Sequence, residues 1–144
     1  MILISHRGNI SGPKPEYEND SNYIESALQS GFDVEIDIFF YKNSLWLGHD
    51  LPKHKIKNVE WLKNKHLWCH AKNIQALDFM LKEQNIHCFW HQEDDCALTS
   101  KGYIWTYPGK DLFSNSIVVL PEQINKTDFS NISGICSDYI NKYK

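Results

Sequence analysis

The sequence predicts an α/β fold, a compact and helix-poor (β/α) barrel of the TIM type, because strand-length apolar runs outnumber helical patterns. Most of these runs are bounded by turn or polar residues, as strands are. Eight are present: Ile2 to Ile4, Val34 to Phe40, Leu45 to Leu47, Leu67 to Cys69, Cys88 to Trp90, Tyr103 to Trp105, Ile117 to Leu120 and Ile135 to Cys136. Such a barrel carries its functional site at the carboxyl ends of the strands.

Helical spacing of apolar residues is clear in only two segments. These run from Ser21 to Gln29, followed by Gly31, and from Ile74 to Glu83. A shorter third helix is predicted around residues 59 to 62. A closed barrel with eight outer helices usually takes ~250 residues, so a chain of 144 residues has either lost helices or left the barrel incomplete. An open edge would favour a homodimer through paired strands.

Composition predicts a single domain over residues 1–144 and excludes several classes of partner. The formal net charge of -3 gives no overall basic surface for nucleic acid. No apolar stretch approaches the ~18 residues of a membrane span. Four cysteines occur without a C-x-x-C pair, and the opening Met-Ile-Leu-Ile-Ser has no basic start or long apolar run. We therefore expect a cytoplasmic protein with reduced thiols.

Reactive side chains stand where predicted strands end. His6 and Arg7 follow the first apolar run, and His49 follows the run that ends at Leu47. The carboxyl ends of strands are where α/β folds place their chemistry. Two histidines with unperturbed pKa values near ~6.5 can hold opposite protonation states at neutral pH, as general acid and base catalysis requires.

The segment from Asp33 to Ile38 alternates acids with aliphatic residues. In a strand, Asp33, Glu35 and Asp37 therefore share one face. Three carboxylates on one face repel one another unless a cation or basic side chains neutralise them. Two acids at i and i+2 suit a hard divalent cation such as Mg2+ or Ca2+. The alternative is an acidic strand edge that faces solvent.

Several short patterns occur in a fixed order along residues 4 to 138: His6-Arg7-Gly8, Glu18-Asn19, Gly31 before Glu35-x-Asp37, His49-Asp50, Cys69-His70-Ala71-Lys72 and Gly134-Ile135-Cys136-Ser137-Asp138. With this set the chain resembles the glycerophosphodiester phosphodiesterases. Their barrel superfamily also includes phosphatidylinositol-specific phospholipase C and the sphingomyelinase D toxins. The resemblance is most specific over the first fifty residues.

The resemblance implies three pairs of roles: acid/base catalysis by His6 and His49, phosphate binding by Arg7 and Lys72, and metal binding by Glu35 and Asp37. In the family a third metal-binding carboxylate usually stands two residues before the lysine. Here that position holds His70, which either binds the metal or contacts phosphate or water. An imidazole ligand would favour Mn2+, Co2+ or Zn2+ relative to Ca2+.

Later strands are expected to wall the site. The connection between Asp50 and Leu67 is shorter than the family usually has, which predicts a more open site. The candidate wall residues are aromatic or polar and follow or end predicted strands: Trp90, His91, Glu93, Trp105 and Tyr107. Trp90 and Trp105 fit the protein core equally well.

These observations predict a metal-dependent phosphodiesterase acting on a small glycerophosphodiester-like substrate. One alternative is a non-catalytic or weakly active barrel that binds a phosphorylated metabolite; another is a lyase that stops at a cyclic phosphate. A structural zinc site is disfavoured, because neighbouring residues such as Cys69 and His70, or His87 and Cys88, face opposite sides of a strand.

Overall fold

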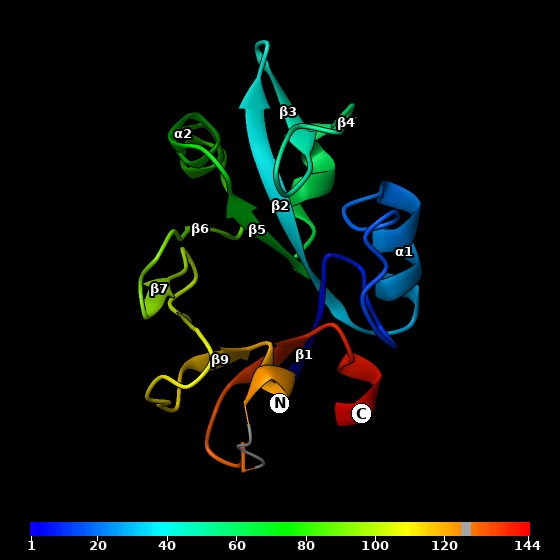
Figure 1. Ribbon diagram of the computed structural model, residues 1–144. Coiled ribbons are helices and arrows are strands. Elements are labelled where there is room, and N and C mark those ends of the chain that lie inside the picture. Colours follow the sequence, from blue (N-terminus) through cyan, green and yellow to red (C-terminus); the bar gives the residue numbers. More distant parts are fainter. Residues whose placement is uncertain (125–127) are drawn as a thin grey trace.

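The computed structural model describes residues 1–124 and 128–144, whose strands belong to a single curled sheet (Figure 1). The strands are β1 (Ile2–His6), β2 (Asp33–Tyr41), β3 (Ser44–Leu47), β4 (His54–Lys55), β5 (Leu67–Ala71), β6 (Cys88–Trp90), β7 (Cys96–Leu98), β8 (Ile104–Thr106), β9 (Ser116–Val119) and β10 (Gly134–Ser137). The α-helices are α1 (Ser21–Gln29) and α2 (Ile74–Lys82), and the 3-10 helices are η1 (Val59–Lys63), η2 (Pro121–Gln123) and η3 (Ile140–Tyr143).

Parallel pairing dominates this sheet. The parallel strands follow the order β6-β5-β2-β1-β10-β9-β8. Beyond this run, β7 pairs antiparallel with β8, and β3 and β4 extend antiparallel from the distal half of β2. β1 and β2 are neighbours in the middle of this run, so the carboxyl end of β1 lies beside the first half of β2, with His6 in register with Glu35.

The predicted TIM-type barrel is wrong, because the sheet stays open as a curled half-barrel. No strand ladder joins β6 to β8 among the described residues. The chain between them forms β7, which turns back onto β8, and a backbone hydrogen bond of 2.8 Å from Ser100 to Cys88 reaches β6. The two α-helices of the described chain are also too few for the outer ring of a closed barrel.

Both α-helices begin at side-chain caps and pack on the outside of the sheet (Figure 1). The Asp20 carboxylate accepts hydrogen bonds from the first backbone N–H groups of α1, and the Asn73 side chain does the same for α2. Gly31, at φ 85°, follows the end of α1. None of the helices in the described part of the chain is long and apolar enough to cross a bilayer.

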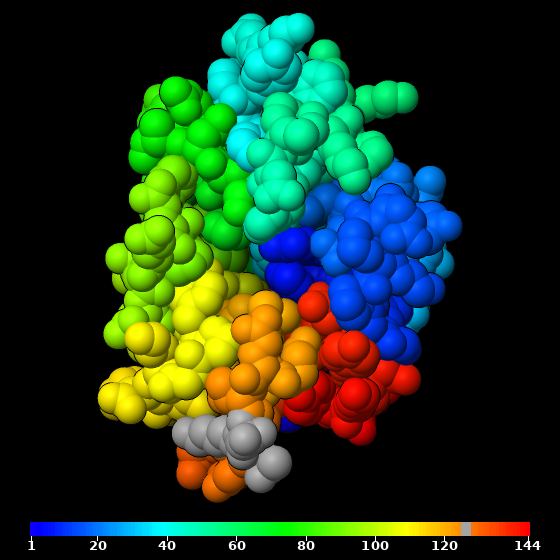
Figure 2. Space-filling view, viewed as in Figure 1, coloured from blue at the N-terminus to red at the C-terminus, as the bar shows by residue number. Residues whose placement is uncertain are grey.

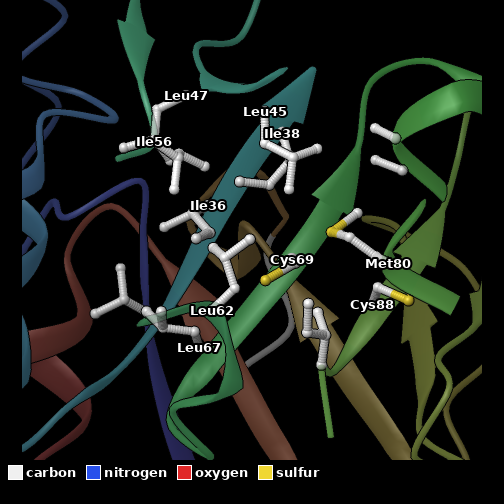
Figure 3. Packing of buried hydrophobic residues seen from close by; sticks show 14 of the residues in the cluster. Ile36, Ile38, Leu45, Leu47, Ile56, Leu62, Leu67, Cys69, Met80 and Cys88 are labelled. Carbon is white, nitrogen blue, oxygen red and sulfur yellow. The ribbon is translucent and has the colours of Figure 1, made fainter. Parts of the chain in front are cut away.

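Alternation along β2 separates the core from the polar interior. Val34, Ile36 and Ile38 are fully buried in the outer core, between the sheet and the helices. Figure 3 shows Ile36 and Ile38 among apolar side chains from neighbouring elements. Glu35 and Asp37 therefore lie on the inner face of the curl, as the alternation of the sequence predicts.

Candidate functional site

A cleft of about 410 Å³ opens at the carboxyl ends of the central strands. It is lined by charged and aromatic side chains with a few apolar ones: His6, Arg7, Glu35, His49, His70, Lys72, Trp90, His91, Gln92, Trp105, Tyr107, Val119 and Leu120. Figure 2 shows the dark blue start of the chain in the middle of this face, surrounded by teal, yellow, orange and red segments. Six of the seven residues predicted for catalysis, phosphate binding or metal binding thus line one cleft, and Asp37 lies beside it.

A sharp turn after β1 directs the first two of these residues. Arg7 has φ 55° and Gly8 has φ 96°, both in the left-handed region. A Cβ at Gly8 would lie 2.6 Å from the ring of Tyr23, so only glycine fits there. The Arg7 backbone N–H donates to the Glu35 carbonyl at 3.0 Å, which fixes this turn against β2.

His6 is held by a carboxylate from the far end of the chain. Its Nδ1 lies 2.7 Å from Asp138 Oδ1, which also accepts a hydrogen bond of 2.8 Å from the Asn9 side chain. His6 Nε2 lies 3.9 Å from Glu35 Oε2. Burial lowers the pKa of His6, but the Asp138 hydrogen bond and the Glu35 charge outweigh it, so the pKa is raised.

Asp37 is a completely buried carboxylate surrounded by cationic and amide groups. Arg7 Nε lies 3.0 Å from Oδ2, His70 Nδ1 lies 3.1 Å from Oδ1, and Lys72 Nζ lies 3.7 Å from Oδ1. The Asn19 amide donates to Oδ2 at 2.9 Å. Burial raises the pKa of Asp37, but its partners hold that pKa far below the usual range.

His70 joins the two acids from β5. Its Nδ1 lies 3.6 Å from Glu35 Oε1, its ring stacks on Phe89 with centroids 5.0 Å apart, and its Nε2 lies 3.4 Å from the His91 carbonyl. Burial lowers the pKa of His70, but the facing carboxylates of Asp37 and Glu35 raise it to about 9. In the absence of a metal ion, a protonated ring therefore supplies a positive charge to this group.

Glu35, Asp37 and His70 form a buried group that can hold a metal ion, with one ligand atom of each within 4.8 Å of the others. Two buried oxygens, Glu35 Oε2 and Asp37 Oδ1, make no hydrogen bond of good geometry and, among the described residues, meet only the ion-pair contacts of His6, His70 and Lys72. A cation would satisfy both oxygens. A His70 Nε2–H directed at the His91 carbonyl leaves Nδ1 free as a ligand, which is the usual arrangement behind metal-binding histidines. The donor set therefore fits a divalent cation.

The third acid of β2 does not belong to this group. Asp33 lies at the opposite end of the strand, where its two oxygens are 2.6 Å from His66 Nδ1 and 2.9 Å from Trp68 Nε1. The shared face predicted for Asp33, Glu35 and Asp37 places two of the three at the cleft. Asp33, the first residue of β2, lies too far along the strand to reach the cleft.

His49 reaches the cleft on a tight turn after β3. Gly48 has φ 152°, and a Cβ there would lie 2.0 Å from the Leu51 carbonyl oxygen, so the turn depends on glycine. His49 Nδ1 lies 2.8 Å from Asp50 Oδ1. The His49 side chain is 39% exposed, so this second histidine is more open to solvent than His6 at 12%.

Four of the five candidate wall residues line the cleft, and Glu93 does not. His91 stacks on Tyr107 with ring centroids 3.6 Å apart. Trp90 is partly buried, while Trp105 is only 2% exposed and packs on Phe89, so Trp105 belongs to the inner core as well as to the wall. Glu93 is exposed in the connection between β6 and β7.

Sequence reasoning assigned no role to Asp138, Asn19 or Glu18, although all three belong to the patterns that carry the resemblance. Glu18 accepts hydrogen bonds from the Arg7 guanidinium at 3.2 Å and from the Asn9 amide at 2.8 Å. The contact of His6 with Asp138 depends on the pairing of β1 with β10. These contacts appear only in the folded chain.

Within the described residues, the Glu35, Asp37 and His70 group is the metal-capable cluster that the structure contains, and no zinc-type cysteine and histidine cluster accompanies it. Cys69 and Cys88 are buried free thiols. No family model, curated protein or solved structure matches the chain. The resemblance to glycerophosphodiester phosphodiesterases therefore stays a prediction carried by the residues quoted above.

Proposed function

We propose that the chain is a metal-dependent phosphodiesterase that hydrolyses a small glycerophosphodiester-like substrate by two-histidine general acid/base catalysis. One observation supports this proposal most strongly. Side chains from β2 and from the carboxyl ends of β1, β3 and β5 converge on one cleft and bring two histidines, an arginine, a lysine and a buried metal-capable group together. Each class of group matches one requirement of phosphodiester cleavage.

In the proposed reaction, one histidine accepts a proton from the attacking water or a neighbouring substrate hydroxyl. The new P–O bond forms as the bond to the leaving alkoxide breaks, and the other histidine protonates that alkoxide. Asp138 holds Nδ1 of His6 and leaves Nε2 for proton transfer. Arg7 and Lys72 stabilise the negative charge that develops on phosphate oxygens.

Glu35, Asp37 and His70 would hold the divalent cation, which supplies Lewis-acid polarisation of a phosphoryl oxygen when bound. Two carboxylates favour Mg2+ or Ca2+, whereas the imidazole improves the relative binding of Mn2+, Co2+ or Zn2+. All four cysteines are free thiols, which supports the expectation of a reducing, cytoplasmic compartment.

The reaction is tested with purified protein, a set of glycerophosphodiesters and a panel of divalent cations, with products identified by phosphorus NMR. We expect a phosphomonoester, and a loss of rate of at least about 100-fold in His6→Ala and His49→Ala. His54→Ala is the control, because His54 is exposed on β4 and does not line the cleft.

Three outcomes would contradict this proposal. Full activity in either variant would eliminate the assigned acid/base pair. A cyclic phosphate as the final product would indicate a lyase. Phosphodiester binding without turnover under any cation would indicate a non-catalytic binding protein.

The metal requirement is tested with Glu35→Gln, which removes one charged ligand oxygen from the group. We expect weaker cation binding by calorimetry and a loss of activation by added cation. Asp33→Asn is a matched control, because Asp33 lies on the same strand face but outside the group. Wild-type activity that persists in excess chelator would refute the requirement.

A further inference from the structure

A second cavity, of about 580 Å³, lies at the opposite ends of the strands. Ile2 and Asp33 are the first residues of β1 and β2, and Tyr103 immediately precedes β8. All three line this cavity, which is larger than the cleft at the carboxyl ends. We call it the amino-end pocket.

Positive charge is in excess around the amino-end pocket. Three lysines line it, Lys63, Lys65 and Lys101, against a single carboxylate, Asp33. Both oxygens of Asp33 already accept hydrogen bonds from neighbouring rings. This local excess contrasts with the net charge of -3 of the whole chain.

Two of the lysines have no acidic partner. Lys63 lies 2.7 Å from Glu60 and 3.4 Å from Glu83, so its charge is balanced. No described carboxylate forms a salt bridge with Lys65 or Lys101. A ligand entering the pocket therefore meets two uncompensated ammonium groups.

The pocket also offers neutral hydrogen-bond donors and an aromatic floor. The side-chain amide of Asn85 and the hydroxyl of Tyr103 make no hydrogen bond to other described residues. Beneath them Trp68 packs against His87 and Tyr103, with ring centroids 4.2 and 5.0 Å apart. Such a lining recognises an anion that carries a small planar or apolar body.

We propose that the amino-end pocket is a second binding site, for a small organic dianion that bears either a phosphate or two carboxylates. Lys65 and Lys101 bind the charged group, and Asn85 and Tyr103 add hydrogen bonds. The body of the ligand lies against the Trp68 and Tyr103 rings. This site is independent of the proposed reaction, because the buried side chains of Trp68, Trp105 and Phe89 fill the interior between the two cavities.

The site is tested by NMR titration with phenyl phosphate, phthalate and inorganic phosphate. We expect saturable shifts of the Trp68 indole and of the Asn85 and Tyr103 amides with phenyl phosphate or phthalate. The two organic probes distinguish a phosphate from a carboxylate preference. The backbone amide resonances of residues at the carboxyl-end cleft, such as Lys72, report any binding there separately.

The double variant Lys65→Gln/Lys101→Gln should weaken binding at the amino-end pocket by about tenfold or more, since two charged hydrogen bonds are lost. Lys55→Gln/Lys57→Gln is the matched control, because it removes the same charge from exposed lysines outside the pocket, and it should weaken binding less than about twofold.

Three results would overturn the proposal: shifts confined to the cleft, no saturable shift with any of the probes, or equal weakening by both double variants, which would indicate diffuse attraction to surface charge.

Discussion

At the scale of single residues, the candidate site depends on buried charges whose partners come from distant parts of the chain. His6 and Asp138 are separated by 132 positions in the sequence, yet their side chains are 2.7 Å apart. Asn19 supports Asp37 through two hydrogen bonds of 2.9 Å, one from its amide and one to its carbonyl. The candidate residues themselves could be predicted from short patterns, whereas these supporting contacts could not.

Replacing Asp138 with Asn should lower both the pKa of His6 and the rate. The carboxylate raises the His6 pKa through its hydrogen bond and charge, so an amide shifts the titration of His6 to lower pH. Because His6 also loses its fixed orientation, we expect kcat to fall by about 10- to 100-fold. NMR titration of the His6 ring and the pH–rate profile measure these effects.

Asp78→Asn is the control for Asp138→Asn, because Asp78 is exposed on α2 and pairs with Lys82, away from the cleft. An unchanged His6 titration in Asp138→Asn, or an equal change in the control, would contradict the positioning role of Asp138.

His87 should make stability depend on pH. It is 5% exposed, donates to or accepts from Thr99 at 2.8 Å, and burial together with the Lys101 charge lowers its pKa to about 4. At neutral pH the ring is uncharged in both folded and unfolded chains. As pH falls from 6.5 towards 4 only the unfolded chain takes up the proton, so the free energy of unfolding should fall by up to about 3 kcal/mol.

Urea unfolding across this pH range measures the contribution of His87. In His87→Gln the part of the pH dependence due to His87 should disappear, whereas His54→Gln, at an exposed position, should retain it. Identical pH profiles for the wild type and His87→Gln would show that His87 does not contribute.

At the scale of elements, short apolar runs predict strands well, and turns decide where their ends point. All eight predicted runs form strands, but β4 and β7 were not predicted. β4 contains only His54 and Lys55, and in β7 the side chain of Leu98 is 73% exposed. Neither segment shows the apolar pattern of a buried strand. Both exist because a neighbouring strand provides backbone partners.

Gly48→Ala should disrupt the turn that carries His49. The new Cβ would lie 2.0 Å from the Leu51 carbonyl oxygen, and φ 152° is unfavourable for alanine, so we expect a loss of more than about 2 kcal/mol of stability. Gly31→Ala is the control, because Gly31 has φ 85° but open space around its Cβ position. The Gly31→Ala variant should lose about 1 kcal/mol of stability.

Thermal or urea unfolding compares the two glycine variants, and the rate of phosphodiester cleavage reports the position of His49. Equal losses of stability in the two variants would contradict this prediction, because they would show that movement of the loop relieves the close approach at Gly48.

At the scale of the whole molecule, eight of the ten strands of the described chain were predictable, but the closure of the sheet was not. The pattern of a strand specifies which face is buried and leaves its neighbours unspecified. The residues between β6 and β8 form β7, which pairs antiparallel with β8 and forms no ladder with β6, so the sheet stays open. The candidate metal-binding group is preserved, because Glu35 and Asp37 on β2 and His70 on β5 lie on strands that are paired on both sides.

The open sheet should nevertheless remain monomeric, in contrast to the homodimer expected from an open edge. The outermost strands of the antiparallel extensions, β4 and β7, have two and three residues, and His54 and Lys55 of β4 are polar and exposed. Strands this short offer few backbone groups for pairing, and a lysine at the edge opposes it. Light scattering should give the mass of one 16.9 kDa chain at micromolar concentration. Leu98 is the most exposed apolar residue of β7, so a dimer that Leu98→Lys dissociates would show instead that this edge pairs.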